Sequence, residues 1–381
     1  MRFFAALLFS VISLSAAAQT PPAPALAANA WLLVDYGANQ VLAEHKADER
    51  IEPASLTKLM TAYLSFSALK ANTLNGEQIA PVSEKAWKMG GSRMFIEPRH
   101  EVTVNQLLRG MIIQSGNDAS VALAEVIAGS EEAFAVLMNR EAKRLGMAHT
   151  HFTNASGLPD DAHYTTARDL GLLAAAIVRD FPEYYSLYSE KEYTYNNIAQ
   201  PNRNRLLWLD PTVDGMKTGH TEAAGYCLVS SAVRGPRRLV SVVLGTASDG
   251  VRTQESLKLL NFGFRFFDTV TLYENAAPVS RFRVWQGQAD EVSVGFLKDF
   301  TLSVPKGQAD KLQVSLNSRQ PIEAPVHKGQ EVGMLTLLLE GKEIGTYPVV
   351  ALEDVALGGW FGRTWDALQL WIKSLSTEAS T

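Results

Sequence analysis

The chain has 381 residues, of which 46% are hydrophobic and 20% are charged. This is enough for two globular domains with real cores, and it excludes a largely disordered protein. The formal net charge of -5 gives no general attraction to nucleic acid, and the single cysteine, Cys227, excludes an intramolecular disulfide and a cysteine-based zinc site. Because the seven histidines show no metal-ligand spacing, no metal or other cofactor is predicted. Cys227 lies in an apolar run, which predicts a buried structural thiol.

The N-terminus has the pattern of an export signal. Arg2 precedes an almost wholly apolar run over residues 3–14, and Ala16, Ala17 and Ala18 provide an Ala-x-Ala cleavage site. The alternative is an uncleaved anchor helix, but spanning a bilayer takes about twenty apolar residues. Residues 1–18 are therefore predicted to be a signal peptide, and the following residues up to 28 a linker.

A hairpin and a helix follow. The apolar runs 30–35 and 40–43 flank a short Tyr-Gly-Ala-Asn turn, which predicts two paired strands. A helical pattern then begins around Ser55. If Ser55 lies in the first turn, Lys58 at i+3 is on the same face, and its amine can reach the serine hydroxyl. A lysine whose charge is suppressed can take that proton, so Ser55 and Lys58 form a candidate nucleophile and base.

Two further motifs come later in the chain. Ser115-Gly116-Asn117 lies on a short connector between two predicted helices, residues 104–113 and 119–128. Lys217-Thr218-Gly219 comes directly before a strand-like run. Each motif alone is weak, since Ser-x-x-Lys occurs by chance in many helices and Lys-Thr-Gly can be an ordinary strand end. Three chance matches in this order are improbable.

The stretches around these motifs predict a mixed domain over residues 29–267. Two amphipathic helices come first, and two strand-like runs and a closing helix come after them: residues 131–145, 167–181, 225–233, 238–246 and 254–266. Strands at both ends with helices between them predict one sheet flanked by helices, which is an α/β (α+β) fold.

From about residue 268 the pattern changes to short β-rich runs separated by turn signals. These runs cover residues 279–285, 291–294, 300–304, 313–316, 332–339 and 346–350. They predict a small all-β domain over residues 268–353 that carries no catalytic constellation. Its expected role is spacing or partner binding.

The tail, residues 354–381, has an amphipathic pattern. Its apolar residues recur at helical spacing: Trp360, Phe361, Trp365, Leu368, Trp371, Ile372 and Leu375. Polar residues set roughly opposite exclude a spanning helix: Arg363, Asp366, Gln369 and Lys373. Tryptophan and leucine on one stripe favour a helix lying in a membrane interface, with a helix docked on the protein or a dimer helix as the alternative.

The three motifs together supply the groups that acyl transfer requires. Ser55 is the nucleophile and Lys58 its base. Ser115 can relay a proton to the leaving nitrogen, and the charge of Lys217 would help to keep Lys58 neutral.

The remaining motif residues suit substrate binding. Asn117 can hold a backbone amide of the substrate, and the Thr218 hydroxyl can bind an anionic end group. Gly219 lets a substrate strand lie close to the backbone. The backbone N–H groups of His220 and Ser55 could form an oxyanion hole.

Residues 53–61, 110–119 and 214–221 resemble the low-molecular-mass penicillin-binding proteins that are D-alanyl-D-alanine carboxypeptidases. The resemblance covers nearly the whole chain, because that family also has a signal peptide, a β-rich second domain and a C-terminal amphipathic anchor. It implies the penicillin-recognising serine hydrolase fold, related to that of β-lactamases, and a periplasmic enzyme attached to the outer face of the inner membrane. It also implies that the penultimate D-Ala of a peptidoglycan stem peptide acylates Ser55 with release of the terminal D-Ala, and that β-lactam antibiotics bind there.

The resemblance adds two arginines to the site. Arg203 and Arg252 match arginines that the family places near the terminal carboxylate of the substrate, and two cations suit one carboxylate. Solvated surface arginines are the alternative for both. Residues 205–211 depart from the common pattern of the family, so the shape of the pocket rim is not predicted.

Three other functions compete with this hypothesis. A D,D-endopeptidase would use the same chemistry, and the tail and second domain favour the carboxypeptidase over it. A class A β-lactamase needs a carboxylate that positions the deacylating water, and the candidates Asp160, Asp161 and Asp169 give no confident counterpart. A non-catalytic wall-binding protein is disfavoured because all the reacting side chains are present.

Overall fold

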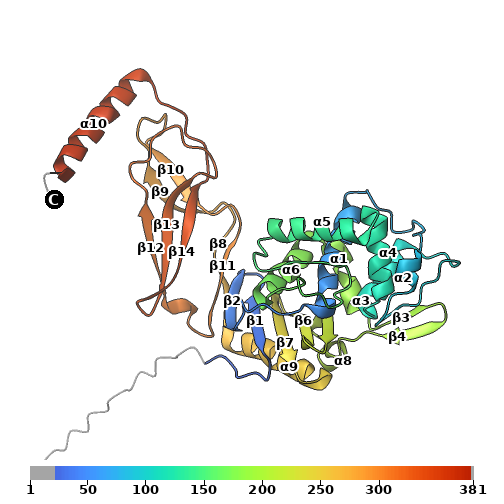
Figure 1. The fold of residues 1–381 in the computed structure, drawn as a ribbon. Helices are drawn as coiled ribbons and strands as arrows, with labels where there is room; N and C mark the ends of the chain where they lie inside the picture. Colours follow the sequence, from blue (N-terminus) through green and yellow to red (C-terminus); the bar gives the residue numbers. More distant parts are fainter. Residues whose placement is uncertain (1–21, 379–381) are drawn as a thin grey trace, which may run out of the picture.

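The structure is a computed structural model that describes residues 22–378, with side chains up to residue 371 (Figure 1). The predicted signal peptide and the side chains of Ile372, Lys373 and Leu375 lie outside the described part. An N-terminal domain, which contains all three motifs, is followed by the β-domain, comprising strands β8 to β14, and by helix α10.

The N-terminal domain is built on a five-stranded antiparallel sheet with the order β2-β1-β7-β6-β5. Its strands are β1 (Ala30–Asp35), β2 (Gln40–His45), β5 (Val213–Thr221), β6 (Gly225–Arg234) and β7 (Arg237–Thr246). Strand β1 pairs with β7, so the start and the end of the domain lie side by side in one sheet. The predicted hairpin and single sheet are therefore confirmed.

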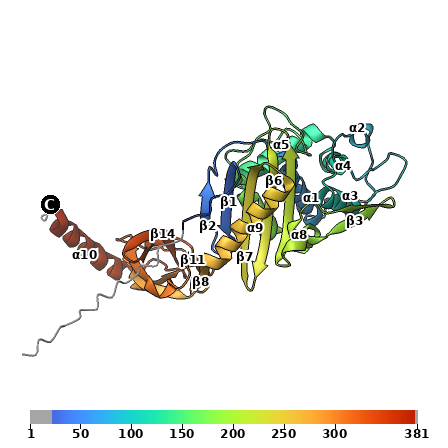
Figure 2. The ribbon, with the colours of Figure 1, turned by 90° about the horizontal axis from the view of Figure 1, so that it is seen from below.

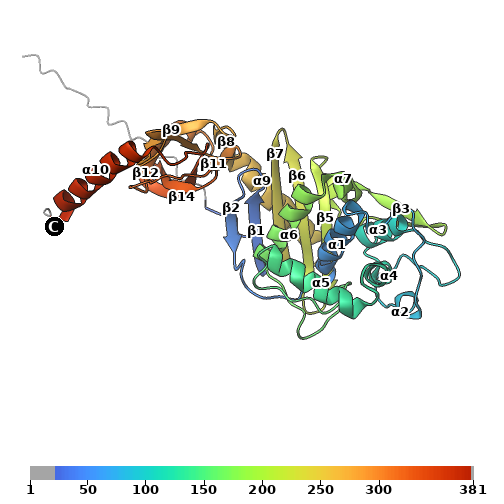
Figure 3. The same ribbon diagram turned by 90° about the horizontal axis from the view of Figure 1, so that it is seen from above.

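Helices cover both faces of this sheet because β1 is apolar on both sides. Leu32 and Val34 belong to the core beneath α6 (Ala167–Asp180), whereas Trp31 and Leu33 belong to the core beneath α9 (Asp249–Phe266). Figure 2 shows α9 across one face, and Figure 3 shows α6 on the opposite face. The remaining elements are α1 (Lys58–Lys70), α2 (Glu84–Trp87), α3 (Val104–Ile113), α4 (Asn117–Ala128), α5 (Glu131–Arg144), α7 (Pro182–Tyr185), β3 (Glu192–Tyr195), β4 (Ile198–Pro201) and α8 (Leu206–Leu209).

The predicted long helices are confirmed, with two shifts at their ends. Helix α9 begins at Asp249 rather than at residue 254, because the Ser248 hydroxyl caps it by accepting a hydrogen bond from Val251 N at 3.2 Å. Asn117 is the first residue of α4 rather than part of the connector. Cys227 is fully buried, and burial raises the pKa of its thiol to about 11, which agrees with a structural role.

The β-domain has its own sheet and its own core, so the predicted all-β domain is confirmed. Its five-stranded sheet has the order β12-β13-β14-β10-β9, and β8 pairs with β11. The strands are β8 (Phe267–Tyr273), β9 (Pro278–Arg283), β10 (Glu291–Gly295), β11 (Phe300–Pro305), β12 (Leu312–Ser318), β13 (Glu331–Leu339) and β14 (Lys342–Ala351). Strand β8 was not predicted, because its outward residues are only half-buried and it follows α9 without a turn.

Asp35, at the end of β1, joins the two domains. It is fully buried, and its Oδ2 accepts hydrogen bonds from Thr269 Oγ1 at 2.5 Å, Ser303 Oγ at 2.7 Å and Arg237 Nε at 2.8 Å. Burial opposes the charged carboxylate, but these hydrogen bonds and the charge of Arg237 outweigh it and lower the pKa of Asp35. Because Thr269 and Ser303 belong to β8 and β11, this carboxylate fixes the contact between the domains.

Helix α10 (Trp360–Glu378) lies on the far side of the β-domain from the N-terminal domain (Figure 1). Its polar side faces the β-domain, where Asp366 Oδ2 accepts a hydrogen bond from Gln286 N at 2.6 Å and Gln369 Oε1 accepts one from Arg283 at 3.1 Å. No helix among residues 22–378 is long and apolar enough to cross a membrane.

Candidate active site

The first motif forms the turn that opens α1. Residues Ala54–Thr57 make a 3₁₀ turn that leads directly into this helix. Residues three apart in such a turn lie one above the other, so Lys58 stands over Ser55 and its Nζ is 2.9 Å from Ser55 Oγ. The predicted proximity of the two side chains is confirmed, although Ser55 precedes the α-helix proper. Leu56 is fully buried and holds the turn against the core.

Two residues of the site have a left-handed backbone, which is uncommon outside glycine. Ala54, directly before Ser55, has a φ of 47°, and Ser115 has a φ of 69°. Such conformations cost about 1–3 kcal/mol and persist where surrounding contacts enforce them. Ala54 adjoins Ser55, and the hydroxyls of Ser55 and Ser115 line the same cleft.

The amine of Lys58 is buried among three oxygen atoms. The residue is 1% exposed. Its Nζ donates hydrogen bonds to Asn117 Oδ1 at 2.7 Å and to the carbonyl of Ser156 at 2.5 Å, and the third oxygen is that of Ser55. A neutral amine has two N–H bonds and one lone pair, so with both carbonyl oxygens occupied its lone pair faces Ser55.

Burial is the main cause that lowers the pKa of Lys58 to about 7, and the charge of Arg203 lowers it further against an opposing effect of Asp118. A large fraction of Lys58 is therefore neutral at pH 7. Lys217 was expected to suppress this charge, but burial and Arg203 are the causes that lower the pKa of Lys58. Burial also lowers the pKa of Lys217 well below its ordinary value, and the charge of Lys58 adds to that effect.

The second motif brings Ser115 and Asn117 to Lys217 and Lys58. Ser115 Oγ accepts a hydrogen bond from Lys217 Nζ at 3.0 Å. Asn117 Nδ2 donates to the carbonyl of Gly90 at 2.7 Å, while its Oδ1 accepts from Lys58. The amide keeps one further N–H and one lone pair, so it can both orient Lys58 and contact a substrate.

Asp118, next to this motif, holds one wall of the site. This fully buried carboxylate accepts hydrogen bonds from the backbone N–H groups of Met94 at 3.0 Å, Phe95 at 2.8 Å and Ile96 at 3.3 Å. The sequence reasoning did not assign it a role. The only available signal was an acidic residue in the first turn of a helix, which usually indicates a cap.

The third motif lies within β5 (Val213–Thr221) and not before a strand as predicted. Lys217 is buried, and its Nζ also donates a hydrogen bond to the carbonyl of Thr218 at 2.9 Å. A Cβ at Gly219 would lie 3.2 Å from the carbonyl oxygen of Pro53 and 3.3 Å from Ala54 Cβ. The glycine therefore lets β5 pack closely against the Ser55 turn, a reason that the sequence did not reveal.

A loop over residues 153–163 closes the site behind Lys58. Gly157, with a φ of 84°, has no space for a side chain, because a Cβ would lie 1.8 Å from the carbonyl oxygen of Ala54. This close approach brings the carbonyl of Ser156 to Lys58. A backbone acceptor has no sequence signature, so Ser156 was not predicted.

Both predicted arginines line the cleft beyond the third motif. Arg252 is 6% exposed, and its Nη1 donates to the carbonyl of Gly219 at 3.3 Å. Its Nη2 pairs with Asp249, which also pairs with Arg205 Nε at 2.6 Å. Arg203 is solvent-exposed, and its Nε donates to the carbonyl of Gln114 at 3.1 Å. The alternative of a solvated surface arginine is therefore wrong for Arg252, which is buried, whereas Arg203 is exposed and lines the cleft.

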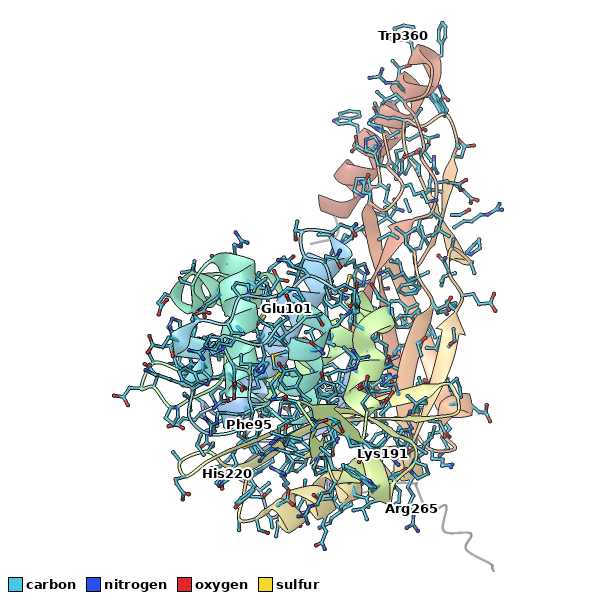
Figure 4. The ribbon with its side chains drawn as sticks, turned by 90° about the vertical axis from the view of Figure 1, so that its right-hand side faces the viewer. Phe95, Glu101, Lys191, His220, Arg265 and Trp360 are labelled. Atoms are coloured by element: carbon cyan, nitrogen blue, oxygen red, sulfur yellow. The ribbon has the colours of Figure 1, made fainter. Side chains whose placement is uncertain are left out.

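These groups surround a cleft of about 660 Å³. Its lining includes Ser55, Ser115, Thr218, Gly219, His220, Arg203 and Arg252. Lys58, Asn117 and Lys217 lie behind it and reach it through hydrogen bonds. His220 is exposed at the rim, with its ring centroid 4.0 Å from that of Tyr226. Figure 4 shows His220 far from Trp360, which lies at the opposite end of the molecule.

Carboxylates are scarce in this cleft. Among the described residues that line it, Asp249 carries the one carboxylate, and it is engaged by arginines. Asp169 instead accepts hydrogen bonds from His149 N at 2.8 Å and Thr150 Oγ1 at 2.7 Å. Asp160 and Asp161 are exposed outside the cleft. None of these last three carboxylates lines the described cleft beside Ser55.

Known proteins resemble both domains. Residues 16–248 match the family described as D-alanyl-D-alanine carboxypeptidase, and residues 267–357 match the family described as penicillin-binding protein 5, C-terminal domain. The D-alanyl-D-alanine carboxypeptidase DacC of Escherichia coli is 47% identical over 363 residues, which cover 93% of this chain and 91% of that protein.

Solved structures agree with these matches. Penicillin-binding protein 5 from Haemophilus influenzae has a TM-score of 0.85 at 39% identity, over 88% of this chain and 99% of that one. Penicillin-binding protein D2 from Listeria monocytogenes, in its ampicillin-bound form, has a TM-score of 0.59 at 32% identity, over 64% of this chain and 100% of that one.

Proposed function

The chain belongs to the D-alanyl-D-alanine carboxypeptidase family of serine hydrolases, and from the geometry of its cleft we propose that Ser55 is the residue acylated by the substrate. One observation carries this proposal. Asn117 Oδ1 and the Ser156 carbonyl occupy both N–H bonds of a neutral Lys58, which leaves its lone pair directed at Ser55 Oγ 2.9 Å away.

Acylation follows from this arrangement. Ser55 Oγ attacks the carbonyl carbon of the penultimate D-Ala while its proton passes to Lys58 Nζ. The backbone N–H groups of Ser55 and His220 bind the resulting oxyanion. When the C–N bond breaks, Ser115 passes its hydroxyl proton to the leaving nitrogen and takes up the proton that Lys58 had accepted, which leaves Lys58 neutral. Lys217 donates a hydrogen bond to Ser115 Oγ and so leaves the hydroxyl proton of Ser115 available for this transfer. The terminal D-Ala then leaves.

The far end of the cleft suits the free carboxylate of the substrate. Arg252 and Arg203 supply positive charge there, and Thr218 supplies a hydroxyl donor next to Gly219. Asp249 forms an ion pair with Arg252, which fixes the guanidinium before substrate arrives. Peptides with a free C-terminus are therefore the preferred substrates, and Asn117 contacts the peptide backbone with its remaining N–H and lone pair.

Release of the acyl group requires a water in place of the leaving amine. Lys58, neutral again after the first step, removes a proton from that water while the water oxygen attacks the acyl carbon. The proton then passes from Lys58 to Ser55 Oγ as the ester bond breaks. No carboxylate assists this step, since Asp249 is the one in the described cleft lining and it is paired. When a β-lactam ring opens, its nitrogen stays attached to the acyl group and keeps water from the position of the leaving amine. The acyl bond to Ser55 is then not hydrolysed, and a long-lived penicilloyl enzyme forms. The ampicillin-bound relative from Listeria supports this proposal.

Substitution of Ser55 tests the assignment. The Ser55→Ala variant is expected to release no D-Ala from a peptide that ends in D-Ala-D-Ala, and to form no covalent adduct with penicillin. Release of D-Ala at the wild-type rate by this variant would contradict the assignment. Thermal unfolding of both proteins serves as the control for folding.

We further propose a division of labour along the chain. Residues 29–267 act on the peptidoglycan stem peptide, residues 268–353 form a spacer, and residues 354–381 attach the protein to the outer face of the inner membrane, after export to the periplasm by residues 1–18. The exposure of α10 supports the attachment. Trp360 and Phe361 are 70% and 81% exposed, and Trp365, Leu368 and Trp371 are also exposed on the side away from Asp366.

A further inference from the structure

His163 is a buried titratable residue that the reaction described above does not use. It lies behind the Ser55 turn and is 2% exposed. Its ring packs edge-on against Phe152, with the ring centroids 5.7 Å apart. Its Nε2 is 2.7 Å from Oγ1 of Thr57, a fully buried residue between Ser55 and Lys58.

The hydrogen bonds of His163 fix which ring nitrogen carries the proton. Nδ1 is 3.0 Å from the backbone N–H of Thr153, and a backbone N–H only donates, so Nδ1 is the acceptor. The neutral ring therefore carries its proton on Nε2, which donates to Thr57 Oγ1. Burial lowers the pKa of His163 to about 4, and the charges of His151 and Lys58 lower it while Asp160 opposes them, so the ring is neutral at pH 7.

This hydrogen bond is one of three that join the loop over residues 153–163 to the start of α1. Thr57 accepts from His163, Lys58 donates to the carbonyl of Ser156 at 2.5 Å, and Thr61 Oγ1 donates to the carbonyl of Ala155 at 2.7 Å. The middle contact directs the lone pair of Lys58. Its geometry depends on how the loop is held against the helix on either side.

We propose that His163 is a positioning residue for the reaction, which acts through Thr57 to hold the Ser156 carbonyl and the Ser55 turn in register. His163 spans the two because it binds Thr153 at the start of the loop and Thr57 in the turn. This role rests on the proposed function of Ser55 and Lys58. The positioning role of His163 requires a hydrogen-bond donor at Nε2. Packing of the ring against Phe152 is not sufficient for this role.

Two substitutions separate the roles of the two ring nitrogens. In His163→Gln the side-chain amide reaches the position of Nε2 and can donate to Thr57. In His163→Asn the shorter amide reaches the position of Nδ1 and can bind only Thr153. A misplacement of reacting groups by about 1 Å can cost 10²-fold, so we expect His163→Asn to lower the rate of penicilloylation and kcat by about 10- to 100-fold with KM nearly unchanged. His163→Gln should stay close to the wild type.

Thr57 provides the matched test. Thr57→Val removes the hydroxyl at nearly constant volume, and Thr57→Ser keeps it. If His163 acts through Thr57, the double variant that combines His163→Asn with Thr57→Val is no slower than Thr57→Val alone, because contacting residues are not additive. Additive losses in the double variant would overturn the proposal, as would equal rates for His163→Asn and His163→Gln.

The measurements are the rate of adduct formation with penicillin, followed by mass spectrometry, and kcat and KM for a D-Ala-D-Ala peptide, with thermal unfolding in parallel. A lowered unfolding temperature with unchanged rate constants for the folded protein would also overturn the positioning role. If the wild type forms an adduct on Ser55 and the variants form it at the same rate, only the positioning role of His163 is refuted. If the wild type forms no adduct, the proposed function of Ser55 is refuted.

Discussion

Lys58 Nζ lies 2.9 Å from Ser55 Oγ, in a site where the other partners of the amine are both carbonyl oxygens. No carboxylate is hydrogen-bonded to this amine among the described residues, so burial rather than an ion pair determines its charge. A buried lysine without an ionic partner readily loses its proton. Lys58 is therefore suited to act as a neutral base beside the nucleophile Ser55.

The rate of acylation should rise with pH. Burial lowers the pKa of Lys58 to about 7, and only the neutral amine can accept the Ser55 proton. The value of kcat/KM is therefore expected to rise through pH 7 and to level off above it, and to fall about tenfold per pH unit well below it.

Lys58→Arg provides the control, because a guanidinium stays charged and loss of a general base costs about 10²–10⁴-fold. A kcat/KM that is flat between pH 5 and 9 would exclude Lys58 as the base; the measurement is peptide hydrolysis by the wild type and this variant across that range.

Arg252 should discriminate between charged and neutral C-termini. A hydrogen bond to a charged group contributes about 1.5–3 kcal/mol, so Arg252→Ala is expected to lower kcat/KM for a free-acid peptide by about 10- to 100-fold. The same peptide with an amidated C-terminus lacks the charge and should lose much less.

Arg265→Ala, at the other end of α9 and outside the cleft, is the matched control. Equal losses for the acid and the amide in Arg252→Ala would remove Arg252 from carboxylate recognition.

Asp35 should contribute to stability and not to catalysis. Asp35→Asn keeps the shape of the side chain but leaves Arg237 without its charged partner, and breaking a buried pair costs about 3–5 kcal/mol. Urea unfolding is expected to show a loss of this size, while peptide hydrolysis under native conditions stays the same. Asp299→Asn alters an exposed carboxylate of the β-domain and should change stability very little. An unaltered unfolding midpoint for Asp35→Asn would show that the domain contact does not depend on this charge.

Helix α10 should direct the protein to lipid surfaces. Removal of residues 357–381 is expected to abolish sedimentation with phospholipid vesicles and to leave peptide hydrolysis unchanged. Trp365→Ala, on the exposed stripe, should weaken binding by about tenfold, because interfacial binding scales with the buried apolar area. Asp366→Asn, on the side that faces the β-domain, is the control and should bind as the wild type does. Undiminished sedimentation of the truncated protein would refute the attachment.

The sequence predicted what depends on spacing and pattern. An i, i+3 relation brought Ser55 and Lys58 together, and two apolar runs flanking a short turn predicted the hairpin of β1 and β2. Groups that depend on backbone geometry were missed, above all the Ser156 carbonyl, because any residue can supply a carbonyl. Asp118 and Asp249 were missed for a related reason, since an acidic residue in a first helical turn usually indicates a cap.

Two other differences came from tertiary packing. Gly219 was expected to admit a substrate strand, and the structure adds a second reason for the glycine, because a Cβ there would lie 3.2 Å from the carbonyl oxygen of Pro53 beside the Ser55 turn. The β3–β4 hairpin was not predicted because its strands, Glu192–Tyr195 and Ile198–Pro201, are short and mostly exposed. The last residues of this hairpin line the cleft and form part of the rim, whose shape was not predicted from the sequence.

The most direct test is mass spectrometry of the protein without its tail, incubated once with penicillin and once with a peptide ending in D-Ala-D-Ala. We predict a stable penicilloyl adduct on Ser55 and loss of one alanine from the peptide. Rapid turnover of penicillin with an untouched peptide would instead indicate a β-lactamase. If the protein formed no adduct and cleaved no peptide, the assignment of Ser55 and Lys58 as a working nucleophile and base would be contradicted.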